Sequence, residues 1–132
     1  MIQNVKGKKY LINGGLGMIG STIAKILVEA EAEVSIVDAM IKPFGANLFN
    51  IKKIKDQVKT SIFDIKNTDD LKKEIEDKDV IFNLAGQVAH NDSIINPLYD
   101  AKLNYLYQLN IMECIKQVNP NAKVIFSGSR LQ

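Results

Sequence analysis

The sequence is poor in the residues from which disulfides, zinc sites and membrane spans are built. Its 132 residues include one cysteine, Cys114, and one histidine, His90, so neither an intrachain disulfide nor a zinc site of cysteines and histidines can form. It has no apolar run of the length that a membrane helix needs, and no cleavage pattern of a secretory signal follows the lysines near the N-terminus. We therefore expect a cytoplasmic protein that binds no metal and contacts no membrane.

An excess of charge of one sign is also missing, which argues against a nucleic-acid partner. Lysine and arginine number 17 against 15 aspartates and glutamates, and no dense basic run carries interleaved aromatic residues. The share of apolar residues, 46%, and that of charged residues, 24%, are typical of a folded globular chain. The length fits one domain over residues 1–132.

β-prone apolar runs alternate with segments in which apolar residues recur at helical spacing. We expect strands at 9–12, 34–37, 58–63, 79–84 and 122–127, and helices at 18–30, 48–54, 68–76 and 97–118. The N-cap of the helix at 68–76 is expected at Asn67 or Thr68. The strand runs look covered on both faces, which predicts a parallel sheet with right-handed crossovers. The fold class is therefore α/β, a doubly wound, Rossmann-like sheet of about five strands in the order 3-2-1-4-5, with helices on both faces.

The last of these helices is the longest, and its apolar residues predict one buried face. Pro97 opens it, and His90 and Asp92 are expected in the polar loop or turn before it. Asn104 is given a structural role inside the helix, as a partner of nearby backbone. The expected buried face consists of Leu103, Leu106, Tyr107, Ile111, Cys114, Ile115 and Val118.

The glycine-rich segment between the first strand and the first helix is the most informative part of the chain. Gly14, Gly17 and Gly20 are spaced three residues apart. The first permits a tight turn, the second lets a pyrophosphate approach the backbone, and the third lets the helix pack close to the strand. The start of the helix then offers unpaired N–H groups and a positive dipole end to phosphates. This turn predicts a dinucleotide site.

Asp38 supplies the acidic partner that such a site needs. It follows Gly20 by 18 residues and stands at the end of the second expected strand. A carboxylate there accepts hydrogen bonds from the adenosine ribose hydroxyls and repels a 2′-phosphate, and no arginine accompanies it. NAD is therefore favoured over NADP as the cofactor.

Taken together, these residues and the segments after them resemble one family. The sequence is similar to the short-chain dehydrogenase/reductase superfamily, in its extended branch of NAD-dependent nucleotide-sugar epimerases and dehydratases. The resemblance runs along essentially the whole chain. It rests on the segments Gly14–Gly20, Asp38, Phe63–Ile65, Asn83–Gln87, Ser93 with Pro97, Asn104, and Phe126–Arg130.

The resemblance implies a role for each matching position. Met18 and Ile19 would bind the pyrophosphate through their backbone, and Asp64 would accept from the adenine amino group. Ser129 matches the family's catalytic serine or threonine, which hydrogen-bonds the sugar at the reacting carbon. The full set of implied cofactor-binding residues is Gly14, Gly17, Met18, Ile19, Gly20, Asp38, Asp64, Ile65, Leu84, Ala85, Gly86 and Ser127.

Several positions depart from the family pattern. Leu103 replaces a polar cofactor contact seen in many members, and Tyr107-Gln108 stands where glycine-threonine is typical. Asparagines replace a usual threonine at Asn13 and a common histidine at Asn83. The family's acid/base is a tyrosine with a lysine four residues later, and none of the tyrosines here has that lysine. We therefore expect a chain cut before this pair and before the sugar-binding region, and inactive alone.

The resemblance implies an NDP-sugar epimerase or 4,6-dehydratase that acts through a transient keto-sugar. The full-length protein would bind a nucleotide sugar and form a homodimer, commonly through the long helix together with a later helix, and the oligomeric state of this chain alone stays open. Two alternatives stay open: a reductase of the same family that uses NAD or NADP, and a stand-alone NAD-binding or sensing module without catalysis. The chain could also hold only the ADP half of the cofactor, because later residues normally enclose the nicotinamide.

Overall fold

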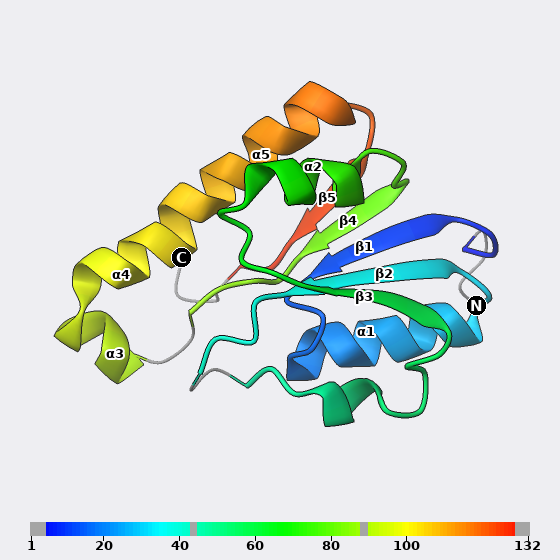
Figure 1. The fold of residues 1–132 in the computed structure, drawn as a ribbon, viewed down its shortest axis with the longest axis horizontal. Coiled ribbons are helices and arrows are strands. Elements are labelled where there is room, and N and C mark those ends of the chain that lie inside the picture. The colour runs from blue at the N-terminus through cyan, green and yellow to red at the C-terminus, as the bar shows by residue number, and fades with distance from the viewer. Residues whose placement is uncertain (1–4, 43–44, 88–89, 129–132) are drawn as a thin grey trace.

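Parallel strands form one sheet in the order β3-β2-β1-β4-β5, as the sequence predicts. The computed structural model describes residues 5–42, 45–87 and 90–128 of the chain (Figure 1). Its strands are β1 (Lys9–Asn13), β2 (Glu33–Asp38), β3 (Val58–Ile62), β4 (Val80–Asn83) and β5 (Lys123–Phe126). Its helices are α1 (Met18–Glu29), the 3-10 helix η1 (Leu48–Ile51), α2 (Thr68–Ile75), α3 (His90–Ile95), α4 (Pro97–Ala101), the π-helix η2 (Lys102–Leu106) and α5 (Tyr107–Val118).

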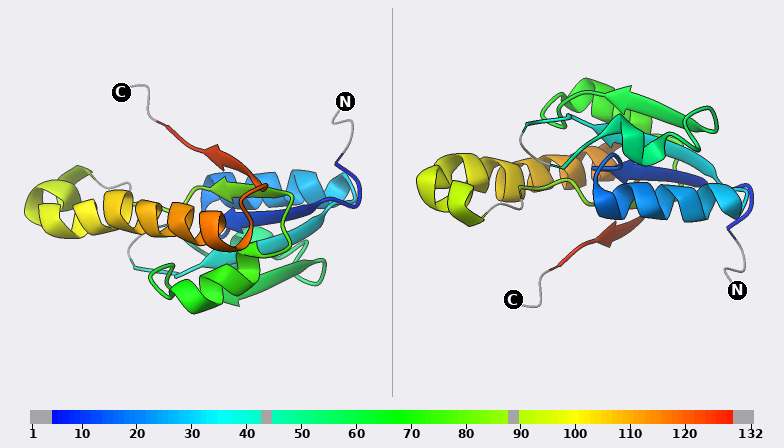
Figure 2. Two further views of the ribbon diagram at one scale, coloured as in Figure 1. Left: turned by 90° about the horizontal axis from the view of Figure 1, so that it is seen from above. Right: turned by 90° about the horizontal axis from the view of Figure 1, so that it is seen from below.

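The sheet is covered by α1 on one face and by α2 and α5 on the other (Figures 1 and 2). Alternate residues of the strands point to opposite faces, so each face has its own core. On the α1 face, Ile12 and Ile36 of the strands pack with Ala24 and Leu27 of the helix. The opposite core consists of Leu11, Val37, Ile65, Leu71, Ile75, Ile81, Ile111, Cys114 and Ile115.

Side-chain caps begin two of the helices where the sequence places turn residues. The Asn67 side chain accepts a hydrogen bond from the Asp70 amide at the start of α2, and Asn96 accepts one from the Tyr99 amide at the start of α4. Asparagine is a preferred N-cap because its oxygen satisfies an amide that the helix leaves unpaired. The N-cap expected at Asn67 or Thr68 is therefore Asn67.

The region before and within the long helix differs from the expectation. His90–Ile95 forms the short helix α3 where a polar loop was expected, and its Ser93 hydroxyl donates to Asp100 of α4. Periodicity could not reveal so short a helix, because its first residues are polar. The long helix also contains the π turn η2.

This turn changes which residues of the long helix are buried. The expected face is right for Leu103, Ile111 and Cys114, which are all buried, but wrong for Leu106, whose exposed fraction is 48%. A π turn holds more residues than an α turn, so the side chains on either side of it fall out of the ordinary helical phase. Leu106 is thereby turned away from the sheet.

Strand β5 contradicts the expectation that every strand is covered on both faces. All of its residues, Lys123 to Phe126, are exposed. It pairs with β4 only, at the edge of the sheet, and an apolar groove between it and α1 is lined by Ile26, Phe82 and Val124 among others. Within the described residues, no helix is long and apolar enough to cross a membrane.

At the end of the sheet opposite the glycine turn, one asparagine links α5 to α2 and to the turn that follows α2. The Asn119 side chain, just after α5, donates to the carbonyl oxygens of Ile75 at 3.0 Å and Lys78 at 2.8 Å. These carbonyls belong to the end of α2 and to the turn into β4. The asparagine therefore fastens α5 to α2.

We predict that Asn119→Ala lowers the free energy of unfolding by about 1–3 kcal/mol, because two carbonyl groups lose their shared donor. Urea denaturation followed by circular dichroism measures this change. The matched control is Asn121→Ala, an exposed position two residues later, which should leave stability unchanged within error. Equal stability of both variants would contradict the assigned role of Asn119.

Candidate nucleotide-binding cleft

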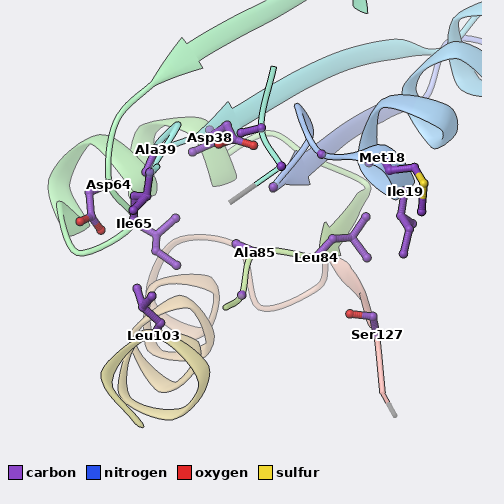
Figure 3. A pocket seen from close by; sticks show the side chains of 18 residues that line it. Met18, Ile19, Asp38, Ala39, Asp64, Ile65, Leu84, Ala85, Leu103 and Ser127 are labelled. Atoms are coloured by element: carbon purple, nitrogen blue, oxygen red, sulfur yellow. The ribbon is translucent and has the colours of Figure 1, made fainter. Parts of the chain in front are cut away.

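A cleft of about 380 Å³ opens at the carboxyl ends of β1, β2 and β4 (Figure 3). Clefts of this size at the point where strand order reverses are the usual ligand sites of doubly wound folds. Every cofactor-binding residue expected from the sequence lines it: Gly14, Gly17, Met18, Ile19, Gly20, Asp38, Asp64, Ile65, Leu84, Ala85, Gly86 and Ser127. The structure therefore brings these residues together. The expected catalytic serine, Ser129, lies outside the described residues.

Further residues line the cleft that the sequence analysis did not place there. Ala39 and Ile41 follow Asp38 directly, so their position after a strand end was a usable signal. Gly45 and Ala46 lie in an irregular segment and carry no such signal. By contrast, Leu103 of η2 matches a cofactor-contact position of the family, so its place in the cleft agrees with the resemblance.

The glycines of the turn meet three different steric demands. Gly14 adopts φ +77°, and a Cβ added to it would lie 2.9 Å from the Ala85 backbone nitrogen. A Cβ at Gly20 would lie 2.5 Å from the Gly14 carbonyl oxygen, a distance that no side chain tolerates. A Cβ at Gly17 would meet only ordinary contact at 3.5 Å, so the fold itself does not exclude a side chain there. Gly17 instead leaves room on the cleft side of the turn.

The N-terminus of α1 faces this room, and no side chain among the described residues caps it. Its N-cap is Gly17, which makes no side-chain cap, and the first turn holds no acidic residue. The first intrahelical hydrogen bond runs from the Ser21 amide to the Gly17 carbonyl. The preceding amides and the positive end of the helix dipole are suited to an anion such as a pyrophosphate.

Asp38 is buried at the end of β2 and is held by two backbone amides. Its carboxylate accepts from the Leu16 amide at 3.1 Å and from the Met40 amide at 2.8 Å. A carboxylate has about four lone-pair sites, so it can accept further hydrogen bonds from hydroxyl groups. One side chain thus positions the glycine turn and offers a negative, acceptor-only surface to the cleft.

The glycine turn is also hydrogen-bonded to η1 and to Asn47, the residue before η1. The Leu16 carbonyl accepts from the Asn47 amide at 3.1 Å and from the Asn50 side chain at 2.8 Å. Both backbone groups of Leu16 are therefore occupied, one by Asp38 and the other by these asparagines. The turn is preorganised before any ligand arrives.

The far end of the cleft is apolar with one acidic group. Ile65 and Leu103 are both buried and line the cleft on facing sides, with Asp64 beside them (Figure 3). One oxygen of Asp64 accepts from the Lys66 amide at 3.0 Å, and the Lys66 ammonium lies 3.3 Å from the other. A flat apolar ring with an amino group on its edge matches these surroundings.

Among the described residues, no group of three or more histidines, cysteines or acids could hold a metal ion. Cys114 is buried between α5 and the sheet, and burial raises the pKa of its thiol. A thiol kept protonated in this way is a packing residue rather than a nucleophile.

The sequence that forms this cleft matches the model of a known family. The family described as GDP-mannose 4,6 dehydratase has a model that matches residues 11–130. The chain belongs to this family. This membership confirms the predicted resemblance: the proteins that the chain matches are NAD-dependent nucleotide-sugar epimerases and dehydratases of the extended short-chain dehydrogenase/reductase branch.

Two relatives are each 30% identical to this chain. The chain is 30% identical over 123 residues to CDP-paratose 2-epimerase of Salmonella typhi, covering 92% of this chain and 36% of that protein. The structure of UDP-N-acetylglucosamine 4-epimerase from Methanobrevibacter ruminantium, in complex with UDP-N-acetylmuramic acid, is 30% identical with a TM-score of 0.83, covering 95% and 39%.

A third relative was crystallised with the cofactor. The Bordetella bronchiseptica enzyme WbmF in complex with NAD+ is 26% identical with a TM-score of 0.85, covering 98% of this chain and 38% of that one. The chain thus spans little more than a third of the length of these family members.

The contrast between two glycines gives a test of the cleft. We predict that Gly17→Ala changes the free energy of unfolding by at most about 1 kcal/mol, the usual scale for an N-cap change. Its affinity for ADP-ribose should fall at least about tenfold, since the methyl group occupies room beside the helix N-terminus.

Gly20→Ala should show the opposite pattern, because the added methyl group must push α1 away from Gly14. We expect a loss of about 3 kcal/mol or more in stability, the upper range for overpacking. Urea denaturation and titration calorimetry of both variants measure the two effects. A larger loss of stability in Gly17→Ala than in Gly20→Ala would refute this reading of the turn.

Proposed function

We propose that this chain is the NAD-binding part of a nucleotide-sugar epimerase or 4,6-dehydratase. The observation that carries the proposal is the single cleft in which the open turn at Gly17, the uncapped start of α1 and the buried Asp38 adjoin one another. Pyrophosphate, ribose and adenine each have a chemically matched surface in it. The family membership and the NAD+ complex of WbmF support the same cofactor.

The surroundings of Asp38 favour NAD over NADP. Its carboxylate is fixed by Leu16 and Met40, so it cannot turn away from a 2′-phosphate. The residues that follow it, Ala39 to Ile41, supply no positive charge. A phosphate placed there would face an uncompensated negative group, which costs binding energy.

Bound NAD supplies reversible hydride transfer, which would create and then remove a transient keto-sugar. In this proposal Ser127, at the end of β5, lies on the wall of the cleft near Leu84 and helps to hold the reacting end. Ser129 would hydrogen-bond the sugar at the reacting carbon. The relatives that act on or bind CDP-paratose and UDP-N-acetylmuramic acid support a nucleotide sugar as the substrate class.

A second candidate is a cofactor-binding module without catalysis, or a reductase of the same family. The observation in its favour is the cleft itself, because its lining is suited to bind a cofactor and binding requires no catalytic base. Turnover of a nucleotide sugar by the protein that contains this chain would decide for the first candidate.

We also propose that the complete protein forms a homodimer through its long helix. Leu98, Tyr105 and Leu109 are exposed along α4, η2 and α5. Exposed apolar side chains gathered on one helix are typical of an interface. Light scattering of the complete protein and of its Leu109→Glu variant tests this, and a monomeric wild type would contradict it.

For the cofactor, we predict that Asp38→Ala lowers NAD affinity about 10- to 100-fold, because hydrogen bonds to a charged acceptor are worth about 1.5–3 kcal/mol. Its preference for NAD over NADP should shrink as well, since the repulsive charge is gone. Titration calorimetry with both cofactors measures both effects. The control, Asp56→Ala, removes an exposed carboxylate outside the cleft and should bind NAD as the wild type does.

Titration with ADP-ribose shows how much of the cofactor the chain holds. Equal affinity for ADP-ribose and NAD would mean that the described cleft recognises only the ADP half. A strong preference for NAD would mean that the nicotinamide is held too. Unchanged NAD affinity in Asp38→Ala would contradict the assignment of the ribose site.

A further inference from the structure

Gln108 of α5 connects three segments around the cleft with one side chain. Its Oε1 accepts from the Asn83 side chain at 2.7 Å. Its Nε2 donates to the Ala85 carbonyl at 3.0 Å and to the Leu103 carbonyl at 2.9 Å. The amide thus uses its acceptor and its donors together, and it ties the end of β4 to the helix on the other side of the cleft.

The helix segment that it holds is the π turn η2. The amide of Tyr107 bonds to the carbonyl of Lys102, five residues earlier, which is the hydrogen bond of a π-helix. Such turns are rare and are frequently found at functional sites. The Gln108 amide donates one of its hydrogen bonds to the carbonyl of Leu103, inside this turn.

The π turn decides where Leu103 points. Leu103 is 7% exposed and forms a wall of the cleft that faces Ile65 (Figure 3). Leu106, three residues later and on the same face of an ordinary helix, is exposed instead. Without the wide turn, Leu103 and Leu106 would share one side of the helix, and the wall opposite Ile65 would change.

The floor of the cleft depends on the same contacts. Ala85 lines the cleft, and its carbonyl is fixed by Gln108. Just beyond it, the Asn104 side chain accepts from the Gln87 amide at 2.8 Å and donates to the Gln87 carbonyl at 3.1 Å. The loop after β4 is therefore held at two points by the helix that carries Leu103.

We propose that Gln108 is a positioning residue for the adenine end of the cofactor. Its amide bonds the Leu103 carbonyl and so holds Leu103 on the side of the cleft that faces Ile65. This inference rests on the proposed function, since it takes the ligand to be an adenine nucleotide. The structure joins Gln108 to Leu103 directly by a hydrogen bond.

Four variants separate the hydrogen bonds of Gln108 from the side chain of Leu103. Gln108→Glu keeps the size and loses the donors to Ala85 and Leu103, whereas Gln108→Leu keeps the approximate volume and loses every hydrogen bond. Leu103→Ala removes the wall without touching Gln108. Gln117→Leu, at an exposed position of the same helix, is the matched control.

The experiment measures ADP-ribose affinity by titration calorimetry and stability by urea denaturation for each variant. We expect Gln108→Glu, Gln108→Leu and Leu103→Ala each to weaken binding about tenfold, and Gln117→Leu to bind as the wild type does. Because Gln108 acts through Leu103, adding Gln108→Leu to Leu103→Ala should weaken binding by less than about threefold more.

Each result bears on the inference. Losses that multiply in the double variant, or lower stability with unchanged ADP-ribose affinity in the Gln108 variants, would make Gln108 a structural residue only. Wild-type affinity in Leu103→Ala would overturn the inference even if the Gln108 variants failed to fold. A wild-type chain that binds neither ADP-ribose nor NAD would instead overturn the proposed function.

Discussion

The structure depends on one close contact, between the start of α1 and the turn that leaves β1. A Cβ at Gly20 would lie 2.5 Å from the Gly14 carbonyl, so helix and turn touch backbone to backbone. This contact aims the first turn of α1 across the carboxyl ends of the strands. The hydrogen bonds of Asp38 and Asn50 to Leu16 then fix the turn in place. The open N-terminus of α1, the position of Asp38 and the core beneath α1 all follow from that geometry.

The parts of the fold that the sequence predicts well are those set by local chemistry. The glycine spacing, the acid at Asp38 and the apolar strands each carry their own signal, and the strand order and the residues of the cleft agree with them. The N-cap at Asn67 belongs to the same class, since its role depends on residues within one turn.

The parts that the sequence does not predict depend on distant contacts. Helix α3 is polar at its start and packs through Ser93 on Asp100, so its residues alone give no helical pattern. The π turn η2 is invisible to a search for regular periods, and Gln108, which bonds to it, has its other partners at Ala85 and Asn83, more than twenty residues earlier. The exposure of β5 is a property of the sheet edge rather than of its apolar residues.

That edge has a consequence for how the chain behaves in solution. Within the described residues, no strand pairs with the outer side of β5, and the exposed side chains of Val124, Ile125 and Phe126 accompany the unpaired peptide groups. A bare apolar edge of this kind is a template for any extended polypeptide, and proteins usually protect such edges with charge, proline or a covering segment. Within β5 itself, only Lys123 is charged and no residue is proline. A segment that paired with β5 would satisfy these peptide groups and cover these apolar side chains, at a place distinct from the cleft.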